Sequence, residues 1–323
     1  MIIDLHRESA IKSQARMRKA IFFHGILSRD IEMHRLFENI KRAAQTGESI
    51  YISGETGVGK ELVARAIHAE SKRAQKPFIA VNVANFSSDL IESQLFGHKK
   101  GAFTGAVADS KGFIRAAAQG TLFLDEVTCL SPKTQAKLLR VLQERQFYPV
   151  GDVKLQKFSA SIVSASNLSF EDAIAQYNFR EDLRYRLEVI PLKVPPLRAR
   201  RDDIILLFNY FLKQASGGKQ WKIDRRLANK LKNYSWPGNV RELENCARFS
   251  AAMATHDRLL INDFPDTIQK ALTLHKRANR KKLTRKVVAK ALHKNANNRN
   301  KTAEFLGISR MTLWRKMKAF NLF

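Results

Sequence analysis

The stretch Ile50-Tyr51-Ile52-Ser53-Gly54-Glu55-Thr56-Gly57-Val58-Gly59-Lys60-Glu61 decides the fold of this chain. A short apolar run comes first, then a turn with three glycines, then a lysine that opens a helical pattern. Such a turn lets backbone N–H groups approach phosphate oxygens, while the helix N-terminus favours negative charge and the lysine reaches the outer phosphates. A glycine-rich turn alone can be structural, but its position between a strand and a helix favours nucleotide binding by residues 54–61.

The sequence around this turn alternates strands with helices. Short apolar runs at 50–53, 78–81, 121–124 and 161–164 are typical of buried strands, because both faces of a parallel sheet are covered. Helical patterns lie between them, and Ser131-Pro132 forms the expected N-cap and first residue of one helix. This alternation predicts a doubly wound α/β domain.

The domain boundaries follow from changes in pattern. We expect the α/β domain over residues 27–200, a small all-helical lid over 201–265, a basic linker over 266–282 and a last helical unit over 283–323. Residues 1–26 show no clear period, and we predict no fold for this N-terminal extension.

Two acidic residues, Asp125 and Glu126, end the apolar run that begins at Thr121. A parallel strand delivers its last residues to the carboxyl edge of the sheet, where ligands bind in such folds. We therefore expect Asp125 to hold Mg²⁺, directly or through water, and Glu126 to polarise an attacking water. Asn167 and Asn82 end two other predicted strands. Asn167 is a candidate to orient the phosphate or the water, and Asn82 could hydrogen-bond Glu126, although either asparagine alone is more often a turn residue.

Arg241 lies at an electrostatically unfavourable position of its predicted helix. Asn239 resembles an N-cap, with Glu242 at the third helical position, so Arg241 would lie in the first turn, where the helix dipole disfavours a cation. Such a conflict is expected where a residue serves a ligand, and Arg241 is a candidate nucleotide contact.

Two further arginines, Arg180 and Arg186, flank Asp182. One interpretation is an Asp182–Arg186 pair one helical turn apart, which contributes little to stability. The other is that both arginines stabilise transition-state charge in the site of a neighbouring subunit. The local pattern does not separate the two.

The charge of the chain indicates a polyanionic partner. There are 57 Lys and Arg against 30 Asp and Glu, a formal net charge of +27. Residues 270–323 alone hold 16 basic residues and one acid, so more than half of the excess lies near the C-terminus. An excess of this size points to nucleic acid or an anionic membrane surface, and the tail lacks the broad apolar face that a membrane helix needs.

The C-terminal segment from Asn300 to Lys318 has the pattern of a helix, a turn and a second helix. Ala303 is small where two helices would cross, Gly307 would make the turn and Ser309 would cap the second helix. Leu313 and Met317 would face inward, which leaves the DNA-contacting side to Ser309, Arg310, Thr312, Arg315 and Lys316. A basic hairpin used only for packing is the alternative.

Cysteine usage and hydropathy indicate a cytoplasmic protein. Cys129 and Cys246 are far apart in the sequence and form neither a disulfide framework nor a zinc motif. No apolar run reaches the length needed to cross a bilayer, and the charged N-terminus is not a signal peptide.

Several motifs in order resemble the AAA+ activators of sigma-54 RNA polymerase, the bacterial enhancer-binding proteins. The most specific is Gly101-Ala102-Phe103-Thr104-Gly105-Ala106, which matches the GAFTGA loop of that family in full. The others are GETGVGKE (54–61), GTLFLDE (120–126), QAKLLRVLQE (135–144), FREDL (179–183), PPLRAR (195–200) and WPGNVRELEN (236–245). The last helices resemble the Fis-type helix-turn-helix of the same family. The resemblance implies the AAA+ P-loop fold with a helical lid.

The resemblance also implies roles for residues. Residues 54–61 and Arg241 would bind ATP, with Arg241 as the second sensor, and Asp125 and Glu126 would serve Mg²⁺ and water. Asn82 would be the glutamate switch, Asn167 the first sensor, and Arg180 and Arg186 the fingers that act in trans. Residues 101–106, with Phe103 and Thr104 foremost, would contact sigma-54. Glu61 agrees with the family, which usually has an acid there.

A mechanical function follows from these roles. Fingers acting in trans require a head-to-tail interface, which closes into a ring. The resemblance implies that this ring is a hexamer, that the protein binds upstream double-stranded DNA, and that ATP hydrolysis converts the closed complex of sigma-54 RNA polymerase into an open one. The residues before the motor are too few for a receiver domain, so we expect control by abundance, an inhibitory protein or a co-activator.

The chain departs from the family pattern at a few positions, listed as Ser159, Ser161, Ser166, Arg184 and Glu188. None of these changes removes a catalytic group, but they affect the segment that would couple nucleotide to loop. The alternatives are an AAA+ DNA-binding regulator that does not act on sigma-54 and another AAA+ machine such as a helicase loader. Neither gives a reason for an intact GAFTGA loop.

Overall fold

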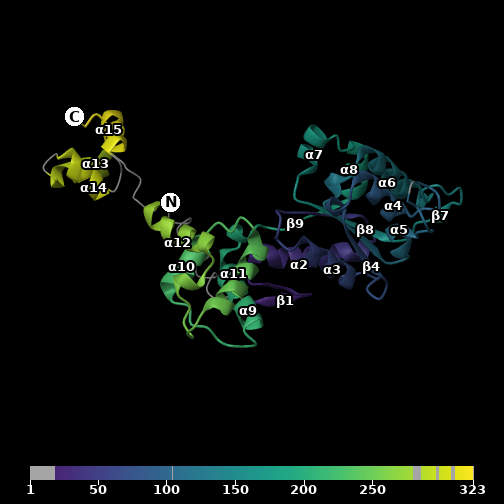
Figure 1. Ribbon diagram of the computed structural model, residues 1–323, viewed down its shortest axis with the longest axis horizontal. Coiled ribbons are helices and arrows are strands. Elements are labelled where there is room, and N and C mark those ends of the chain that lie inside the picture. Colours follow the sequence, from purple (N-terminus) through teal and green to yellow (C-terminus); the bar gives the residue numbers. More distant parts are fainter. Residues whose placement is uncertain (1–18, 104, 279–284, 296–297, 307–309, 323) are drawn as a thin grey trace, which may run out of the picture. The chain divides into compact units, whose positions relative to one another are not determined.

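The computed structural model describes residues 19–103, 105–278, 285–295, 298–306 and 310–322. The chain forms two compact units, one up to Asp263 and the other from Phe264, and each is described by itself (Figure 1). Within the described ranges, no helix combines the length and the apolar character that crossing a membrane requires.

A five-stranded parallel sheet forms the centre of the first unit, with strand order β4-β5-β8-β3-β9. The strands are β3 (Ile50–Ser53), β4 (Phe78–Asn82), β5 (Thr121–Asp125), β8 (Ser161–Ser166) and β9 (Ile190–Lys193). The predicted α/β fold is thus confirmed, together with its four predicted strands. The fifth strand, β9, lies at the edge of the sheet and contains Pro191, which an edge strand tolerates and which hides the strand from sequence patterns.

Helices cover both faces of this sheet, as Figure 1 shows, with α2 and α3 on one side and α4, α6, α7 and α8 on the other. Their bounds are α2 (Ile31–Thr46), α3 (Lys60–Glu70), α4 (Ser88–Phe96), α5 (Gly112–Ala116), α6 (Pro132–Glu144), α7 (Phe170–Tyr177) and α8 (Glu181–Leu187). Strand β5 serves both faces: Phe123 packs toward α2 and α3, while Leu122 and Leu124 pack toward the other layer. Ser131 caps α6 as predicted, because its Oγ accepts the N–H of Thr134.

Short elements connect this framework. They are the 3-10 turns η1 (Val83–Asn85), η2 (Val127–Cys129), η3 (Leu197–Ala199) and η4 (Ile261–Asp263) and the small antiparallel pair β6 (Gln146–Phe147) and β7 (Gln156–Lys157).

A hairpin near the N-terminus corrects the prediction that residues 1–26 have no fold. Strands β1 (Ile21–Phe23) and β2 (Ile26–Ser28) pair antiparallel through a two-residue turn at His24 and Gly25, both with positive φ. Phe23 and Ile26 are buried against the core that contains α2. Strands of three residues are too short to show a period, and this hairpin is stabilised by tertiary packing. Residues 1–18 of the predicted extension lie outside the described residues.

The helices after residue 200 in the first unit form the lid. They are α9 (Arg201–Ala215), α10 (Arg225–Asn233) and α11 (Asn239–Met253). Helices α9 and α11 pack closely, and Phe208, Trp236 and Leu243 between them are fully buried.

The second unit contains α12 (Asp266–Ala278), α13 (Arg285–Lys294), α14 (Arg299–Leu306) and α15 (Arg310–Ala319). Helix α12 corrects the predicted linker over 266–282, since most of that segment is helical. Ile268 and Leu272, one turn apart, are buried, and the basic composition of the segment concealed this apolar stripe. The last three helices share a core listed as Val288, Leu292, Ala303, Leu313 and Met317.

Candidate functional site

The P-loop lies between β3 and α3, at the carboxyl edge of the sheet. Gly59 precedes the first residue of α3 with φ of 102°, and Lys60, only 7% exposed, begins the helix. The Lys60 Nζ donates to Gly54 O at 3.0 Å, so the ammonium group lies within the loop. Gly57 has φ of 78°, and a Cβ there would lie 2.4 Å from Gly238 O. Glycine is therefore required at this position by the backbone angle and by the contact with the lid.

The two predicted acids lie opposite this lysine. Glu126 follows β5 in a left-handed conformation, with φ of 53°, and its Oε1 is 3.4 Å from Lys60 Nζ. A non-glycine residue in this region is uncommon and often marks a functional position. Asp125 is half-buried, and burial raises its pKa, as does Glu126, while Lys60 acts in the opposite direction. Its carboxylate has the oxygen chemistry that Mg²⁺ prefers, and a cation there would offset the cost of burial.

Asn167 joins these groups from the end of β8. Its backbone N–H donates to Glu126 Oε2 at 3.2 Å, and its Nδ2 donates to Thr56 Oγ1 at the same distance. Four residues that the sequence selected from three separate motifs, Lys60, Thr56, Glu126 and Asn167, thus meet at one place. Their roles in hydrolysis stay predictions.

Asn82 lies beside this group but does not join it. It pairs with Asp125 in the register of β4 and β5, and its Oδ1 accepts the N–H of Ala84 at 3.0 Å. The possible hydrogen bond between Asn82 and Glu126 is not formed among the described residues, where the Glu126 carboxylate contacts Lys60 and the Asn167 N–H.

Asn239 corrects the predicted cap of the lid helix α11. Gly238 is the N-cap, and its N–H donates to Glu242. Asn239 instead begins the helix with φ of 52° and lies fully buried. Its Oδ1 accepts the N–H of Leu197 at 2.9 Å, and its Nδ2 donates to Thr56 O at 3.0 Å. The residue therefore fastens the lid to the P-loop.

Arg241 follows in the same turn. Its backbone N–H and that of Val240 point at Gly57 O, at 3.3 and 3.0 Å, so the start of α11 packs directly on the P-loop. The Arg241 side chain is exposed beside the loop. This placement agrees with a nucleotide contact, which stays a prediction.

Glu55 is held by a residue that the sequence did not single out. Arg198 in η3 forms two hydrogen bonds to its carboxylate, at 2.5 and 2.6 Å, and Asn239 Nδ2 adds a third at 3.2 Å. The Arg198 guanidinium holds the pKa of Glu55 below its ordinary value. Glu55 thus ties the P-loop to the segment that leads into the lid.

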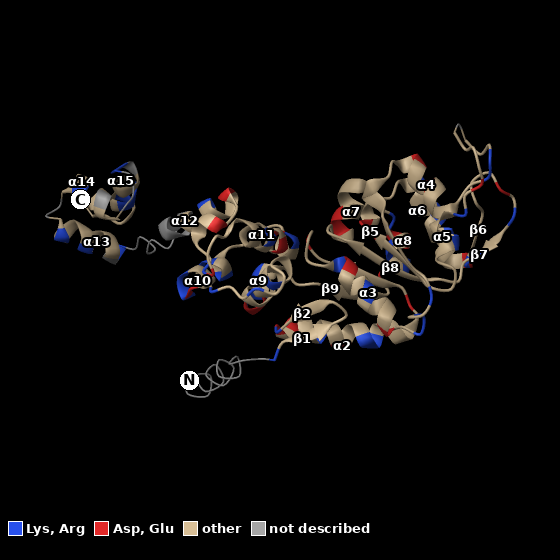
Figure 2. Cartoon of the chain, turned by 60° about the horizontal axis from the view of Figure 1, so that its bottom comes forward, with Lys and Arg blue, Asp and Glu red and all other residues tan. Residues whose placement is uncertain are grey.

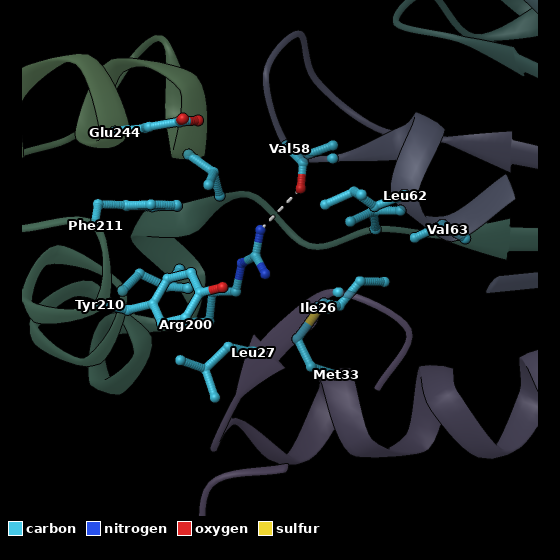
Figure 3. Close-up of a pocket in the computed structure, with 15 residues that line it drawn as sticks. Ile26, Leu27, Met33, Val58, Leu62, Val63, Arg200, Tyr210, Phe211 and Glu244 are labelled. Carbon is cyan, nitrogen blue, oxygen red and sulfur yellow. Dashed lines mark hydrogen bonds between the residues drawn. The ribbon is translucent and has the colours of Figure 1, made fainter. Parts of the chain in front are cut away.

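An apolar pocket opens next to the P-loop, between the hairpin, α3 and the lid (Figure 3). Its walls are contributed by Ile26 and Leu27 from the hairpin and by Tyr210 and Phe211 from α9. A mostly apolar pocket that abuts the P-loop is suited to the base of a nucleotide. Sequence reasoning missed this pocket because its lining residues come from five elements, β2, α2, α3, α9 and α11, and from the segments between them. The PPLRAR motif, which contains Arg200 of the pocket, was the signal that pointed to it.

The two arginines predicted to act in trans lie outside this site, Arg180 at the N-cap of α8 and Arg186 within the helix. The side chain of Arg180 pairs with Asp182 at 3.0 and 2.7 Å, which replaces the predicted Asp182–Arg186 pair. Arg186 is exposed, with no ion-pair or hydrogen-bond partner in the described part of the chain. The Arg180 backbone N–H donates to Gln135 Oε1 of α6 at 2.8 Å, so a buried glutamine sets the start of α8.

Two of the residues that depart from the family pattern, Arg184 and Ser166, form side-chain hydrogen bonds. Arg184 bridges Glu188 of the same helix and Glu171 of α7, at 2.8 and 2.6 Å. Ser166 at the end of β8 shares a hydrogen bond with Thr128 at 2.7 Å. These contacts join α8 to α7, and η2 to the end of β8.

The loop at 101–106 projects between α4 and α5. Its base is held by an ion pair of Lys99 with Asp109 at 2.6 Å and by a hydrogen bond from Gly101 N to Ala106 O at 2.9 Å. Phe103 is 43% exposed and makes an edge-on contact with His98, with ring centroids 5.0 Å apart. Thr104 lies outside the described residues. An exposed aromatic ring on a well-anchored loop is a surface feature suited to a partner.

The predicted DNA contacts lie on α15. Arg310, Arg315 and Lys316 are exposed, and Thr312 is half-buried, whereas Leu313 and Met317 are in the core, as predicted. Figure 2 shows Lys and Arg along α13 and α15. Ser309 and the predicted turn at Gly307 lie outside the described residues.

Family comparisons match most of the chain. Residues 26–193 match the sigma-54 interaction domain, residues 198–281 the AAA+ ATPase lid domain, and residues 280–320 the Fis family of bacterial regulatory proteins.

Individual proteins are similar over most of the chain. A Nif-specific regulatory protein of Bradyrhizobium diazoefficiens is 44% identical over 77% of this chain and 43% of its own length. Regulatory protein AtoC of Escherichia coli is 39% identical over 92% of this chain and 68% of its own length. The crystal structure of NtrX from Brucella abortus in complex with ADP has 33% identity and a TM-score of 0.70, covering 99% of this chain and 75% of that one. The chain spans about half the length of several curated relatives.

Proposed function

The chain belongs to the sigma-54 interaction family of AAA+ ATPases with a Fis-family DNA-binding unit, and we propose that it is an ATP-driven transcriptional activator. It would bind double-stranded DNA upstream of a promoter, in the cytoplasm, and remodel the closed complex of sigma-54 RNA polymerase into an open complex.

The observation that carries this proposal is the meeting of Lys60, Glu126 and Asn167 in a chain that also presents an exposed Phe103 on an anchored loop. The first group supplies hydrolysis. Lys60 neutralises phosphate charge, and Glu126 is released from Lys60 when phosphates take its place, so that its carboxylate can polarise water. Asp125 would hold Mg²⁺, which screens phosphate charge when bound.

The nucleotide that fits best is ATP. NtrX, one of the similar structures, has been solved with ADP and with ATP. The apolar pocket beside the P-loop supports binding of a base, and the packing of the start of α11 on Gly57 supports Arg241 as a phosphate contact.

The assembly we infer is a hexameric ring. Arg180 and Arg186 lie on an exposed helix and do not reach the P-loop of their own chain, so they support a site completed by a neighbour. A head-to-tail contact of this kind closes into a ring.

The partner of the 101–106 loop would be sigma-54. Phe103 is the exposed apolar group on this loop, and Thr104 is the adjacent residue of the same motif. Movement of the loop with the nucleotide state would transmit force, because its base is hydrogen-bonded to α4 through His98 and Ser93.

Transcription from a sigma-54 promoter in a purified system tests the proposal, with ATP hydrolysis followed in parallel. Wild type should open the promoter, whereas Phe103→Ala and Thr104→Ala should hydrolyse ATP without opening it. Glu126→Ala should do neither. Val107→Ala, which truncates an 80% exposed side chain just outside the motif, is the matched control and should behave as wild type. Hydrolysis by wild type with no action on sigma-54 polymerase would leave an AAA+ DNA-binding regulator of another kind.

A further inference from the structure

Glu92 is a buried carboxylate that is held by two lysines of a neighbouring helix. It lies on α4, the helix that leads into the 101–106 loop, and is only 4% exposed. Its Oε1 accepts a hydrogen bond from Lys137 Nζ, and its Oε2 lies 2.9 Å from Lys133 Nζ. The two lysines are one turn apart on α6, and Lys137 belongs to the QAKLLRVLQE motif at 135–144. These three residues, which we call the Glu92 clamp, join α4 to α6.

The clamp is a buried ionic contact that resists separation. Burial alone would raise the pKa of Glu92, but the hydrogen bonds and charges of Lys137 and Lys133 outweigh burial and hold this pKa below its ordinary value. The carboxylate is therefore charged. Separation of α4 from α6 would leave that charge buried without its partners, a loss that is strongly destabilising. The clamp thus makes the two helices shift together.

A short series of contacts leads from Glu92 to the exposed ring of Phe103. The adjacent residue, Ser93, shares a hydrogen bond with His98 Nδ1 at 2.7 Å, and the His98 ring makes an edge-on contact with Phe103. Glu92, Lys133 and Phe103 also line one groove of about 680 Å³. The position of Phe103 therefore depends on the position of α4.

Helix α6 is bonded to the nucleotide site on its other side. Glu126 is followed directly by η2 and then by α6, and the Cys129 N–H donates to Glu126 O at 2.9 Å. Gln135 of α6 donates its Nε2 to Leu130 O at 2.7 Å, and its Oε1 accepts the Arg180 N–H at 2.8 Å. Helix α6 is thus attached both to the segment that carries Glu126 and to the start of α8.

We propose that Glu92 is a positioning residue that couples the nucleotide site to the 101–106 loop by making α4 follow α6. This inference rests on the proposed ATPase function and deepens it. A shift of the segment after Glu126 on nucleotide binding moves α6, and the clamp passes this movement to α4 and to Phe103. Glu92 takes no part in hydrolysis itself, so loss of the clamp separates ATP hydrolysis from movement of the loop.

Hydrogen exchange followed by mass spectrometry tests this coupling in the full chain without sigma-54. Exchange of the peptides containing residues 54–61 and 97–107 is compared in nucleotide-free protein and with ADP, Mg²⁺ and aluminium fluoride. Both peptides should respond to the nucleotide in wild type. In Glu92→Gln, which keeps the size of the side chain but removes its charge, the 54–61 peptide should still respond and the 97–107 peptide should lose its response.

Two results would overturn the proposal while leaving the ATPase function intact. One is a wild-type response of the 97–107 peptide in Glu92→Gln, and the other is a wild type in which 54–61 responds and 97–107 does not. No response at 54–61 in wild type would instead refute the ATPase function on which the inference rests.

Promoter opening per ATP hydrolysed then separates coupling from support of the fold. Glu92→Gln should hydrolyse ATP at the wild-type rate and open a sigma-54 promoter roughly fivefold to a hundredfold less, the usual range of coupling between two sites. A purely structural Glu92 would lower both rates by the same factor and keep their wild-type ratio, which would overturn the proposal. Asp89→Asn, which removes an exposed carboxylate one turn earlier on α4, is the control and should keep the wild-type ratio. Hydrolysis by a wild type that never opens the promoter would refute the sigma-54 function alone, and hydrogen exchange would still decide the coupling.

Discussion

The edge of the sheet that holds the P-loop and the exposed surface of α8 differ in how their charged residues are engaged. At the P-loop, Lys60, Glu126 and Asn167 are bonded to one another within one chain. On α8, Arg186 is exposed without a partner in the described residues, and Arg180 is paired only with its neighbour Asp182.

If Arg180 and Arg186 act in trans as proposed, this difference means that one chain supplies half of a site. The P-loop half is complete within the fold because parallel strands bring their carboxyl ends together. The charge that would neutralise a transition state is presented outward instead, where an exposed ion pair such as Arg180–Asp182 contributes little stability and is easily exchanged for phosphate. The predictions below test whether these two halves belong together.

The largest effect is expected from Arg186→Ala. If Arg186 completes the site of a neighbouring chain, ATP hydrolysis at saturating nucleotide should fall about a thousandfold or more, because it would lose an arginine that stabilises transition-state charge. Arg140→Ala, an exposed arginine on α6, should leave the rate unchanged. A wild-type rate in Arg186→Ala would assign this arginine to the surface alone.

Glu126→Gln should lower the same rate by roughly a hundredfold to ten-thousandfold while ATP binding is retained, because the amide cannot polarise water. Nucleotide binding is followed by fluorescence and hydrolysis by phosphate release. Loss of binding together with hydrolysis would show that Glu126 holds the loop and has no role in the chemical step.

Mixing the two variants sharpens the comparison. A site formed by Glu126 of an Arg186→Ala chain and Arg186 of a Glu126→Gln chain is intact, so a mixture should hydrolyse ATP well above the sum of the separate variants. A merely additive rate would place both residues in the site of a single chain.

A moderate effect, on the free energy of unfolding, is expected from a change at Asn239, which connects the P-loop to the lid. Asn239→Ala removes the side chain that bonds Leu197 and Thr56 and places alanine at φ of 52°. The free energy of unfolding should fall by about 2–3 kcal/mol, measured by urea denaturation. Asn229→Ala, at an exposed position of α10, should change it by under about 0.5 kcal/mol.

The smallest effect on stability concerns Asp125. Burial raises its pKa above the ordinary value, so its ionised form opposes folding at neutral pH and its protonated form does not. Asp125→Asn should therefore abolish Mg²⁺-dependent hydrolysis yet raise the free energy of unfolding of the nucleotide-free protein at pH 7, by under about 1 kcal/mol. The gain should disappear below the ordinary aspartate pKa of about 4. A variant less stable than wild type at pH 7 would mean that the carboxylate is stabilised by its surroundings.

Much of the P-loop half could be read from the sequence because its signals are local. The glycines around Gly57, the lysine at the start of α3 and the acids after β5 each lie within one strand–turn–helix unit. The residues around the pocket could not be read in this way. Arg200, Asn239 and the hairpin at 21–28 act through contacts more than a hundred residues away, such as Arg200 with Val58 and Asn239 with Thr56.

The predictions for the cap of α11 and for the segment after Phe264 were wrong for a similar reason. Local sequence preference favours Asn as an N-cap, but Asn239 is the first residue of the helix. There its buried side-chain amide accepts the N–H of Leu197 and donates to the P-loop. Basic composition favoured a linker after residue 265, although two buried apolar residues one turn apart are enough for α12.

The sequence by itself determined the parallel α/β fold, the P-loop, the acids of β5 and the basic helical unit at the C-terminus, since each depends on short-range pattern and charge. Tertiary structure alone decided the apolar pocket, the buried ion pairs of Glu92 and the outward position of Arg186. Burial and hydrogen-bond satisfaction are properties of segments brought together by folding, and no local pattern encodes which distant atoms a side chain will meet.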